Sequence, residues 1–178
     1  MRIVGGIYKG RTLVEFGGEE IRPTSDKVRE SLFNILRDKV QDCRFLDLFC
    51  GTGAMGIEAL SRGAKEVVIN DLSKKSLGIA KKNLEKLKIN QITITNYDAS
   101  TCLLNTTSPF DIIYIDPPYK SDYGLKALDV AVTALKDDGI VVYENEKPFE
   151  GEVKNLVKYD ERKYGRAYIT FFKKGEQQ

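Results

Sequence analysis

The sequence predicts an α/β fold, a doubly wound and mostly parallel sheet. Between residues 44 and 144, short apolar runs alternate with segments of helical periodicity, which is the pattern of strand–helix–strand units. Several of these runs are nearly continuous, as expected for strands that are covered on both faces. The last two apolar runs flank a glycine turn, which predicts an antiparallel hairpin added to the edge of the sheet.

The middle of the chain supplies the parallel strands and their connecting helices. Strands are predicted at residues 44–49, 66–71, 92–97, 110–115 and 139–144. Helices are predicted at residues 54–61, 73–87 and 125–135. Ser73 is a suitable N-cap for the second helix, whose apolar face consists of Leu77, Ala80, Leu84 and Leu87.

The two ends of the chain differ from this pattern. Residues 1–22 hold two strand-like runs joined by glycines, at 2–4 and 11–14, which predict a small N-terminal β-hairpin. Residues 23–178 are expected to form the main domain, beginning with a helix capped at 24–26. The C-terminal hairpin is predicted at residues 152–157 and 167–172.

Composition excludes several classes of protein. With 178 residues, 42% hydrophobic and 30% charged, the chain has an ordinary globular composition. No apolar run approaches the roughly 18 residues of a membrane span, and the start lacks a signal-peptide pattern, so a cytoplasmic protein is expected. The net charge of +2 does not by itself indicate a polyanionic partner.

The sequence contains no histidine. Ser-His-Asp and Cys-His catalysis and histidine-ligated metal sites are therefore excluded. Cys43, Cys50 and Cys102 form no Cys-x-x-Cys pair, and they are expected to be reduced, buried thiols. We expect neither a metal site nor a membrane contact.

A Gly-x-Gly-x-x-Gly pattern at residues 51–56 lies between a predicted strand and a predicted helix. Glycines allow a tight turn and a close approach to a ligand, and they are expected to leave the amides of the helix N-terminus free to donate. Asp71 ends the next strand, where a carboxylate can bind ribose hydroxyls. These features fit a nicotinamide dinucleotide and S-adenosylmethionine equally well.

Two further carboxylates favour S-adenosylmethionine. Asp47 ends the first strand, where it can reach a cationic amino-acid group but would repel a pyrophosphate. Asp98 follows the third strand, where it could accept a hydrogen bond from an adenine amino group. Taken singly, either aspartate could be a strand-end cap or turn residue, but together with Asp71 they indicate a cofactor site.

The segment from Asp116 to Tyr119, Asp-Pro-Pro-Tyr, directly follows the apolar strand 110–115. Two prolines fix φ and remove two backbone donors, and Asp116 is held extended by the proline after it. The resulting rigid turn presents the Asp116 carboxylate and the Pro117 carbonyl as acceptors, with the Tyr119 ring beside them. Such a turn can orient an exocyclic amine, which needs orientation more than a histidine base, while the ring stacks on an extruded nucleobase.

These residues resemble a known family. Residues 116–119 match the (Asp/Asn)-Pro-Pro-(Tyr/Phe) motif of S-adenosylmethionine-dependent amino-group methyltransferases, and residues 47–56 resemble their cofactor loop. The whole chain resembles the RsmD family of small-subunit ribosomal RNA guanine-N2 methyltransferases. The matching segments are residues 2–6, 10–11, 22–30, 56–63 and 164–168.

The resemblance implies a Rossmann-like, mostly parallel seven-stranded sheet with an antiparallel final hairpin. It implies transfer of a methyl group from S-adenosylmethionine to N2 of a guanine in small-subunit (16S) rRNA, in an RNA already bound by ribosomal proteins. The N-terminal hairpin would then contact RNA, although it could equally be an edge hairpin with solvated cations. Alternatives are an adenine-N6 DNA or protein-glutamine methyltransferase, or a non-catalytic RNA-binding assembly factor.

The residues and resemblance together predict three groups of site residues. The catalytic residues are Asp116, Pro117, Pro118 and Tyr119. The cofactor residues are Asp47, Phe49, Gly51, Thr52, Gly53, Gly56, Asp71, Leu72, Asp98 and Ala99. The RNA-contacting residues are Arg2, Tyr8, Lys9, Arg11, Arg22, Thr24 and Arg29, of which Arg22 and Arg29 could instead pair locally with acidic neighbours.

Overall fold

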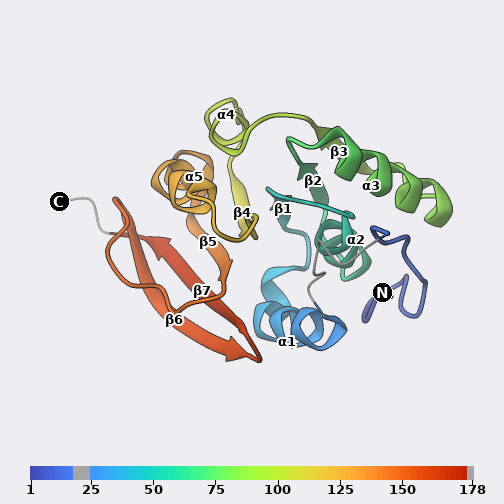
Figure 1. The fold of residues 1–178 in the computed structure, drawn as a ribbon, viewed down its shortest axis with the longest axis horizontal. Helices are drawn as coiled ribbons and strands as arrows, with labels where there is room; N and C mark the ends of the chain where they lie inside the picture. The colour runs from blue at the N-terminus through green and yellow to red at the C-terminus, as the bar shows by residue number, and fades with distance from the viewer. Residues whose placement is uncertain (18–24, 176–178) are drawn as a thin grey trace.

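A seven-stranded sheet runs through the computed structural model, which describes residues 1–17 and 25–175 (Figure 1). Its strands lie in the order β3-β2-β1-β4-β5-β7-β6. Their bounds are β1 Arg44–Asp47, β2 Glu66–Asn70, β3 Ile92–Thr95, β4 Phe110–Ile115, β5 Leu135–Asn145, β6 Leu156–Tyr164 and β7 Ala167–Lys174. The first five strands pair in parallel, whereas β7 pairs antiparallel with β5 and β6. The predicted fold class is confirmed.

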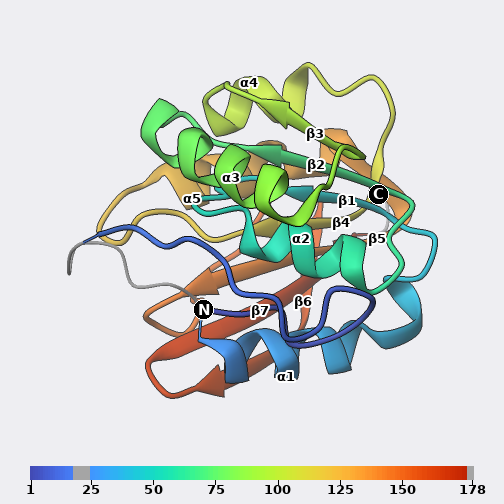
Figure 2. The ribbon, with the colours of Figure 1, turned by 90° about the vertical axis from the view of Figure 1, so that its right-hand side faces the viewer.

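Helices cover both faces of the sheet. Their bounds are α1 Asp26–Leu36, α2 Ala54–Ser61, α3 Lys74–Leu87, α4 Ala99–Leu104 and α5 Tyr123–Ala131, with short 3-10 turns at Arg37–Lys39 and Val132–Ala134. One apolar core joins α1, α2 and α3 to the sheet, and a second joins α4 and α5 to the opposite face. Figure 1 shows α4 and α5 on one side of the sheet and α1 and α2 on the other, and Figure 2 shows α3 from a second side.

The alternation of side chains along β4 explains these two cores. Tyr114 and Ile112 face the core under α1 to α3, whereas Ile113 and Ile115 face the core under α4 and α5. Both sets are buried because a central parallel strand is covered on both sides. The apolar run that predicted this strand therefore fits its position in the sheet.

The strands β1, β2 and β4 end at the same edge of the sheet. Hydrogen bonds continue past the strand ends, from the Leu48 amide to the Tyr114 carbonyl and from the Cys50 amide to the Asn70 carbonyl. The loops after these three strands are therefore held side by side, at the edge where α/β sheets bind ligands.

Helix caps follow the sequence closely. The Ser25 hydroxyl accepts a hydrogen bond from the Val28 amide, and the Ser73 hydroxyl accepts one from the Ser76 amide. Both predicted helix starts are confirmed, and each serine satisfies a backbone donor that the helix itself leaves unpaired.

Several element boundaries differ from prediction. Helix α4 was not predicted, and the predicted helix 125–135 ends at Ala131 in a 3-10 turn, with β5 beginning at Leu135. The predicted strand 152–157 is wrong because β6 begins at Leu156 and continues through charged residues to Tyr164. Charged residues are common on edge strands, where they prevent pairing with a strand of another chain.

The N-terminal segment folds back on itself as a short antiparallel hairpin. An antiparallel bridge joins Arg2 to Thr12, the Ile3 amide donates to the Arg11 carbonyl and the Leu13 amide to the Met1 carbonyl, and the connecting loop carries positive φ at Gly6 and Gly10. Arg22 and Thr24 lie outside the described residues. Over the ranges 1–17 and 25–175, no helix is long and apolar enough to cross a membrane.

Candidate active site

A cavity of about 710 Å³ lies at the carboxyl edge of the sheet. Its walls come from the loop after β1, the end of β2, the start of α3, the segment after β4 and the N-terminal segment. Of the predicted residues, the cavity brings together Arg29, Asp47, Phe49, Gly51, Thr52, Asp71, Asp116, Pro117, Pro118 and Tyr119. The predicted cofactor and catalytic groups therefore share one space.

Asp47 ends β1 and is 1% exposed. Its Oδ2 accepts a hydrogen bond of 3.1 Å from the Gly56 amide, whereas Oδ1 has no hydrogen-bond partner among the described residues. Burial raises the pKa of Asp47 to about 7, the nearby Asp71 charge acts in the same direction, and the Gly56 amide partly opposes both. A buried carboxylate that lacks a counter-charge is suited to a cationic ligand group.

The glycine turn differs from its predicted role. Gly51 and Gly53 adopt positive φ, as such a turn requires. Their amides, however, are already bonded within the protein: Gly51 donates to Asp71 Oδ2, and Gly53 donates to the Cys50 carbonyl. These two bonds make the turn rigid. Of the helix N-terminal amides that the sequence predicts to be free, that of Gly56 donates to Asp47.

Gly56 serves helix packing rather than cavity lining. A Cβ at this position would lie 2.5 Å from a methyl of Ile69 on β2, which is closer than real side chains approach one another. The absence of a side chain lets α2 pack against β2 while its amide binds Asp47. Neither Gly53 nor Gly56 is among the residues that line the cavity.

Asp71 lies directly after β2 and holds two backbone amides. Its Oδ2 accepts from Gly51 at 3.0 Å, and its Oδ1 accepts from Ser73 at 2.8 Å. A carboxylate has about four acceptor positions, so these bonds orient Asp71 and leave capacity for ribose hydroxyls. The same residue thus joins the glycine turn to the start of α3.

Asp98 and Ala99 lie outside the cavity lining. Asp98 is the N-cap of α4, where it accepts hydrogen bonds from the Thr101 amide and hydroxyl. These bonds lower the pKa of its carboxyl. The contact of Asp98, Ala99 and the 64% exposed Leu72 with a cofactor stays a prediction.

The Asp116–Tyr119 turn also lines the cavity. Pro117 is buried against Tyr143 of β5 and Gly124 of α5, where an added Cβ would lie 2.6 Å from the Pro117 ring. Tyr119 is 42% exposed and lines both this cavity and a smaller neighbouring one. The turn is therefore packed against β5 and α5 through Pro117, while the Tyr119 ring remains accessible from the cavity.

The N-terminal segment contributes a wall that sequence reasoning missed. Met1, Glu15 and Phe16 line the cavity. The segment is fixed by Asn83 of α3, which accepts from the Val14 amide and donates to the carbonyls of Val14 and Thr52. Local patterns carry no signal for these contacts, because they join residues that are far apart in the chain.

The segment is also fixed to α2. The buried Glu58 carboxylate accepts from the Val4 amide and from Arg62. Ser61 accepts from the Tyr8 amide and donates to the Gly5 carbonyl. The segment for which an RNA contact is predicted is therefore attached to α2 through residues 4–8.

The predicted RNA residues divide into two groups. Arg2, Lys9 and Arg11 are exposed, and Tyr8 is half-buried against the core. Arg29 is 0% exposed; it pairs with Asp26 at 2.7 Å, donates to the Arg2 carbonyl and lies 3.9 Å from Glu58. Arg29 also lines the cavity, and its contact with RNA stays a prediction, whereas the alternative of a local pair with Asp26 is present in the structure.

Asn70 is a second residue that the sequence did not single out. It is 1% exposed, donates to the Leu48 and Tyr97 carbonyls and accepts from Thr95 and the Tyr97 amide. It therefore connects the ends of β1, β2 and β3. A polar residue at the end of an otherwise apolar strand was its only signal in the sequence.

The donor set fits S-adenosylmethionine. The unpartnered Oδ1 of Asp47 suits an ammonium group, and Asp71 suits ribose hydroxyls. The engaged amides of Gly51 and Gly53 leave little to bind a pyrophosphate. Burial and the charges of Asp47 and Asp71 raise the pKa of the Cys50 thiol, which makes this cavity residue a poor nucleophile.

Comparison with known proteins gives a consistent result. A family profile described as "Conserved hypothetical protein 95" matches residues 1–173. The Escherichia coli protein named ribosomal RNA small subunit methyltransferase D is 36% identical over 155 residues, covering 87% of this chain and 76% of that protein. Putative rRNA methyltransferase YlbH of Bacillus subtilis is 36% identical over 183 residues, covering 98% and 99% of the two chains.

The fold agrees with these sequence matches. A solved structure described as putative methyltransferase yhhF from Escherichia coli superposes with a TM-score of 0.87 at 30% identity, covering 99% of both chains. A second, the putative methylase HI0767 from Haemophilus influenzae, gives a TM-score of 0.79 at 30% identity and covers 98% of both. On the strength of the family profile and these relatives, the chain belongs to the RsmD family of ribosomal RNA small subunit methyltransferases.

Proposed function

We propose that the protein transfers a methyl group from S-adenosylmethionine to the exocyclic N2 of a guanine in small-subunit ribosomal RNA. The observation that carries this proposal is the shared cavity, which both the Asp116–Tyr119 turn and the buried Asp47 line. One wall suits a cationic amino acid and the other suits a nucleobase amine. The names of the relatives support small-subunit rRNA as the substrate.

The turn would act by orienting the amine. The Asp116 carboxylate and the Pro117 carbonyl accept hydrogen bonds from its two N–H groups, which directs the nitrogen lone pair into the cavity. The bound cofactor supplies an electrophilic methyl group on a positively charged sulfur. After transfer the nitrogen is strongly acidic, so its proton leaves without a histidine base. Tyr119 provides the face on which an extruded base stacks.

The substrate is tested with small ribosomal subunits from a strain that lacks this enzyme. Purified protein and labelled S-adenosylmethionine are incubated with subunits, with free rRNA, with DNA and with a protein extract, and nucleosides are identified by mass spectrometry. We expect N2-methylguanosine in the subunits. Label found only in DNA or protein, or cofactor binding with no transfer to any substrate, would reject the proposal.

Asp116→Ala should lower kcat at least about 100-fold, the size typical for a lost transition-state hydrogen-bond acceptor or donor. Affinity for S-adenosylhomocysteine, measured by calorimetry, should change little because the cofactor acids remain. Asp116→Asn keeps one carbonyl acceptor in place and should retain part of the activity. Equal turnover of the alanine variant and the wild-type protein would contradict the role given to Asp116.

A further inference from the structure

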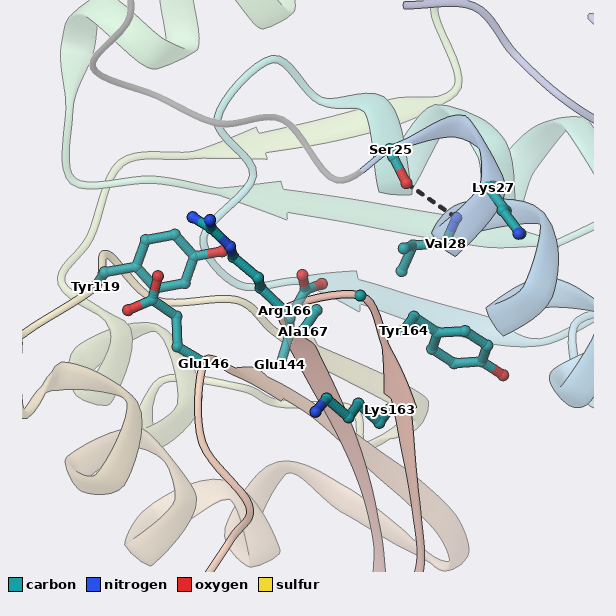
Figure 3. A pocket seen from close by; sticks show the side chains of 11 residues that line it. Ser25, Lys27, Val28, Tyr119, Glu144, Glu146, Lys163, Tyr164, Arg166 and Ala167 are labelled. Atoms are coloured by element: carbon teal, nitrogen blue, oxygen red, sulfur yellow. Dashed lines mark hydrogen bonds between the residues drawn. The ribbon is translucent and has the colours of Figure 1, made fainter.

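A second cavity of about 400 Å³ adjoins Tyr119. Figure 3 shows that its walls come from the start of α1, the end of β5 and the turn between β6 and β7. Tyr119 lines both cavities. A base stacked on this ring while its amine reaches Asp116 would therefore border the second cavity.

Glu144 is the buried charge in this cavity wall, with an exposed fraction of 4%. The parallel register pairs Ile115 with Tyr143, so Glu144 follows on β5 at the level at which Asp116 follows on β4. The carboxylate and Asp116 thus lie at adjacent strand ends.

Tyr114 fixes this carboxylate. Its hydroxyl donates a hydrogen bond to Glu144 Oε2, and the tyrosine is 1% exposed. Tyr114 also lines the cofactor cavity, so this bond links the two cavities. Because a carboxylate accepts several hydrogen bonds, a bond from Tyr114 orients Glu144 and is compatible with a further donor from a ligand.

The Watson–Crick edge of guanine matches two acceptors. It presents the 2-amino group next to an N1–H, so both neighbouring positions donate hydrogen bonds. In 2-aminopurine the same amino group stands next to an N1 that carries a lone pair. A carboxylate facing N1 therefore attracts the first base and repels the second.

We propose that Glu144 selects guanine by accepting the N1–H while Asp116 and Pro117 hold the 2-amino group. This assignment rests on the proposed function, and it adds a residue that determines which base is methylated. Arg166, in the β6–β7 turn, completes the cavity: Figure 3 shows its side chain extending towards Tyr119, with Glu144 and Glu146 nearby. The positive charge of Arg166 reduces the electrostatic repulsion between these two carboxylates and the phosphates of an RNA.

The wild-type protein gives the first test. The methylated guanosine is mapped, and small subunits are reconstituted with RNA that carries either guanosine or 2-aminopurine riboside at that position. We expect 2-aminopurine to be methylated at least about 10-fold more slowly in kcat/KM, the loss typical for one charge-assisted hydrogen bond. Equal rates on the two bases would overturn the proposal without any variant.

Glu144→Gln gives the second test. The amide keeps an acceptor for the Tyr114 hydroxyl and presents an N–H where the carboxylate presented a lone pair. We expect kcat/KM on guanosine to fall about 10- to 100-fold, and the ratio of the two rates to shift towards 2-aminopurine. A fall by the same factor on both bases would reveal a merely structural role and overturn the proposal.

Glu146→Gln is the matched comparison. It removes the same charge from the wall of the same cavity at an exposed position, and it should leave the ratio between guanosine and 2-aminopurine at the wild-type value. A ratio that shifted equally in both variants would assign the effect to net charge and overturn the role of Glu144.

Tyr114→Phe covers the case in which Glu144→Gln does not fold. This variant keeps the Glu144 carboxylate but removes the hydrogen bond from the Tyr114 hydroxyl. The ratio of the rates on guanosine and 2-aminopurine should therefore shift towards 2-aminopurine, by a smaller factor than in Glu144→Gln. Thermal unfolding and S-adenosylhomocysteine affinity are measured for each variant. If wild-type protein methylates no guanine at all, the proposed function fails; if it methylates guanine and ignores these changes, only the role of Glu144 fails.

Discussion

At the scale of single residues, Asp47 carries an electrostatic cost that a cationic cofactor would relieve. Its carboxyl is buried, receives one amide hydrogen bond and lies near the second carboxylate of Asp71. Raising its pKa to about 7 means that the carboxyl of the unliganded protein is protonated below about pH 7 and charged above it. Burial without a counter-charge disfavours the ionised Asp47 in the unliganded protein, and for the same reason it favours binding of a positively charged group.

The first prediction concerns stability against pH. Because the pKa of Asp47 is raised on folding, its unfavourable contribution is absent below pH 4 and grows as the pH rises to about 7. Asp47→Asn should therefore stabilise the unliganded protein at pH 8, by up to about 4 kcal/mol, and should hardly change it at pH 4. Urea unfolding of both proteins at the two pH values measures the difference.

The cofactor should respond in the opposite direction. Asp47→Asn should weaken S-adenosylhomocysteine binding, because the ammonium group loses its counter-charge. A variant that is no more stable at pH 8 than at pH 4, relative to wild type, would contradict the shifted pKa. A stabilised variant that still binds the cofactor fully would contradict the contact between Asp47 and the ammonium group.

At the scale of secondary-structure elements, buried strands and capped helices were predictable because their signals are local. The apolar run of β4 and the caps Ser25 and Ser73 needed no knowledge of distant residues. Helix α4 has an aspartate cap but only six residues. Six residues are too few to show a helical period in the sequence. Strand β6 lies at the sheet edge and contains a run of consecutive charged residues, so its identity comes from pairing with β7 rather than from its own pattern.

The candidate site divides in the same way. Asp47, Asp71 and the Asp116–Tyr119 turn could be predicted because each directly follows a strand that was itself recognisable, and parallel strands end at one edge. Phe16 and Glu144 could not be predicted as site residues. Their places depend on how the N-terminal segment and the C-terminal hairpin fold back onto the sheet.

The second prediction concerns the N-terminal loop as an element. Gly6 has a φ of 75°, and a Cβ there would overlap the Ser61 carbonyl at the end of α2. Gly10 has a φ of 83° and nothing within 4 Å of the same position. Gly10→Ala should therefore cost only the roughly 1–2 kcal/mol of an unfavourable φ, whereas Gly6→Ala should cost more and detach the loop from α2.

Urea unfolding and calorimetry with S-adenosylhomocysteine compare the two glycine variants. Because the loop leads to Glu15 and Phe16 in the cavity wall, Gly6→Ala should also bind the cofactor more weakly than Gly10→Ala does. Equal losses of stability and affinity in the two variants would contradict the anchoring of this loop on α2.

At the scale of the whole molecule, the two cavities together bring segments from both ends of the chain to the site. The N-terminal segment forms one wall, the loops after β1 and β4 form others, and Tyr119 leads into the second cavity beside the β6–β7 turn. Asn83 joins the Val14 backbone to the Thr52 carbonyl of the glycine turn. Ordering the turn around a ligand should therefore order the N-terminal segment as well.

The third prediction is a change in hydrogen exchange that extends beyond the glycine turn. Adding S-adenosylhomocysteine at about 100 times its dissociation constant should stabilise the folded protein by about 2.7 kcal/mol. Exchange of the Tyr8 and Val14 amides, which bond to Ser61 and Asn83, should slow together with that of Gly51 and Gly56. Exchange in the β6–β7 hairpin, which pairs with β5, should slow less.

Mass spectrometry of exchanged peptides resolves these regions, and Asn83→Ala should uncouple the N-terminal peptides from the turn. Protection confined to the turn in the wild-type protein would show that the N-terminal segment is a passive wall, because a segment coupled through Asn83 must share in the ordering of the site.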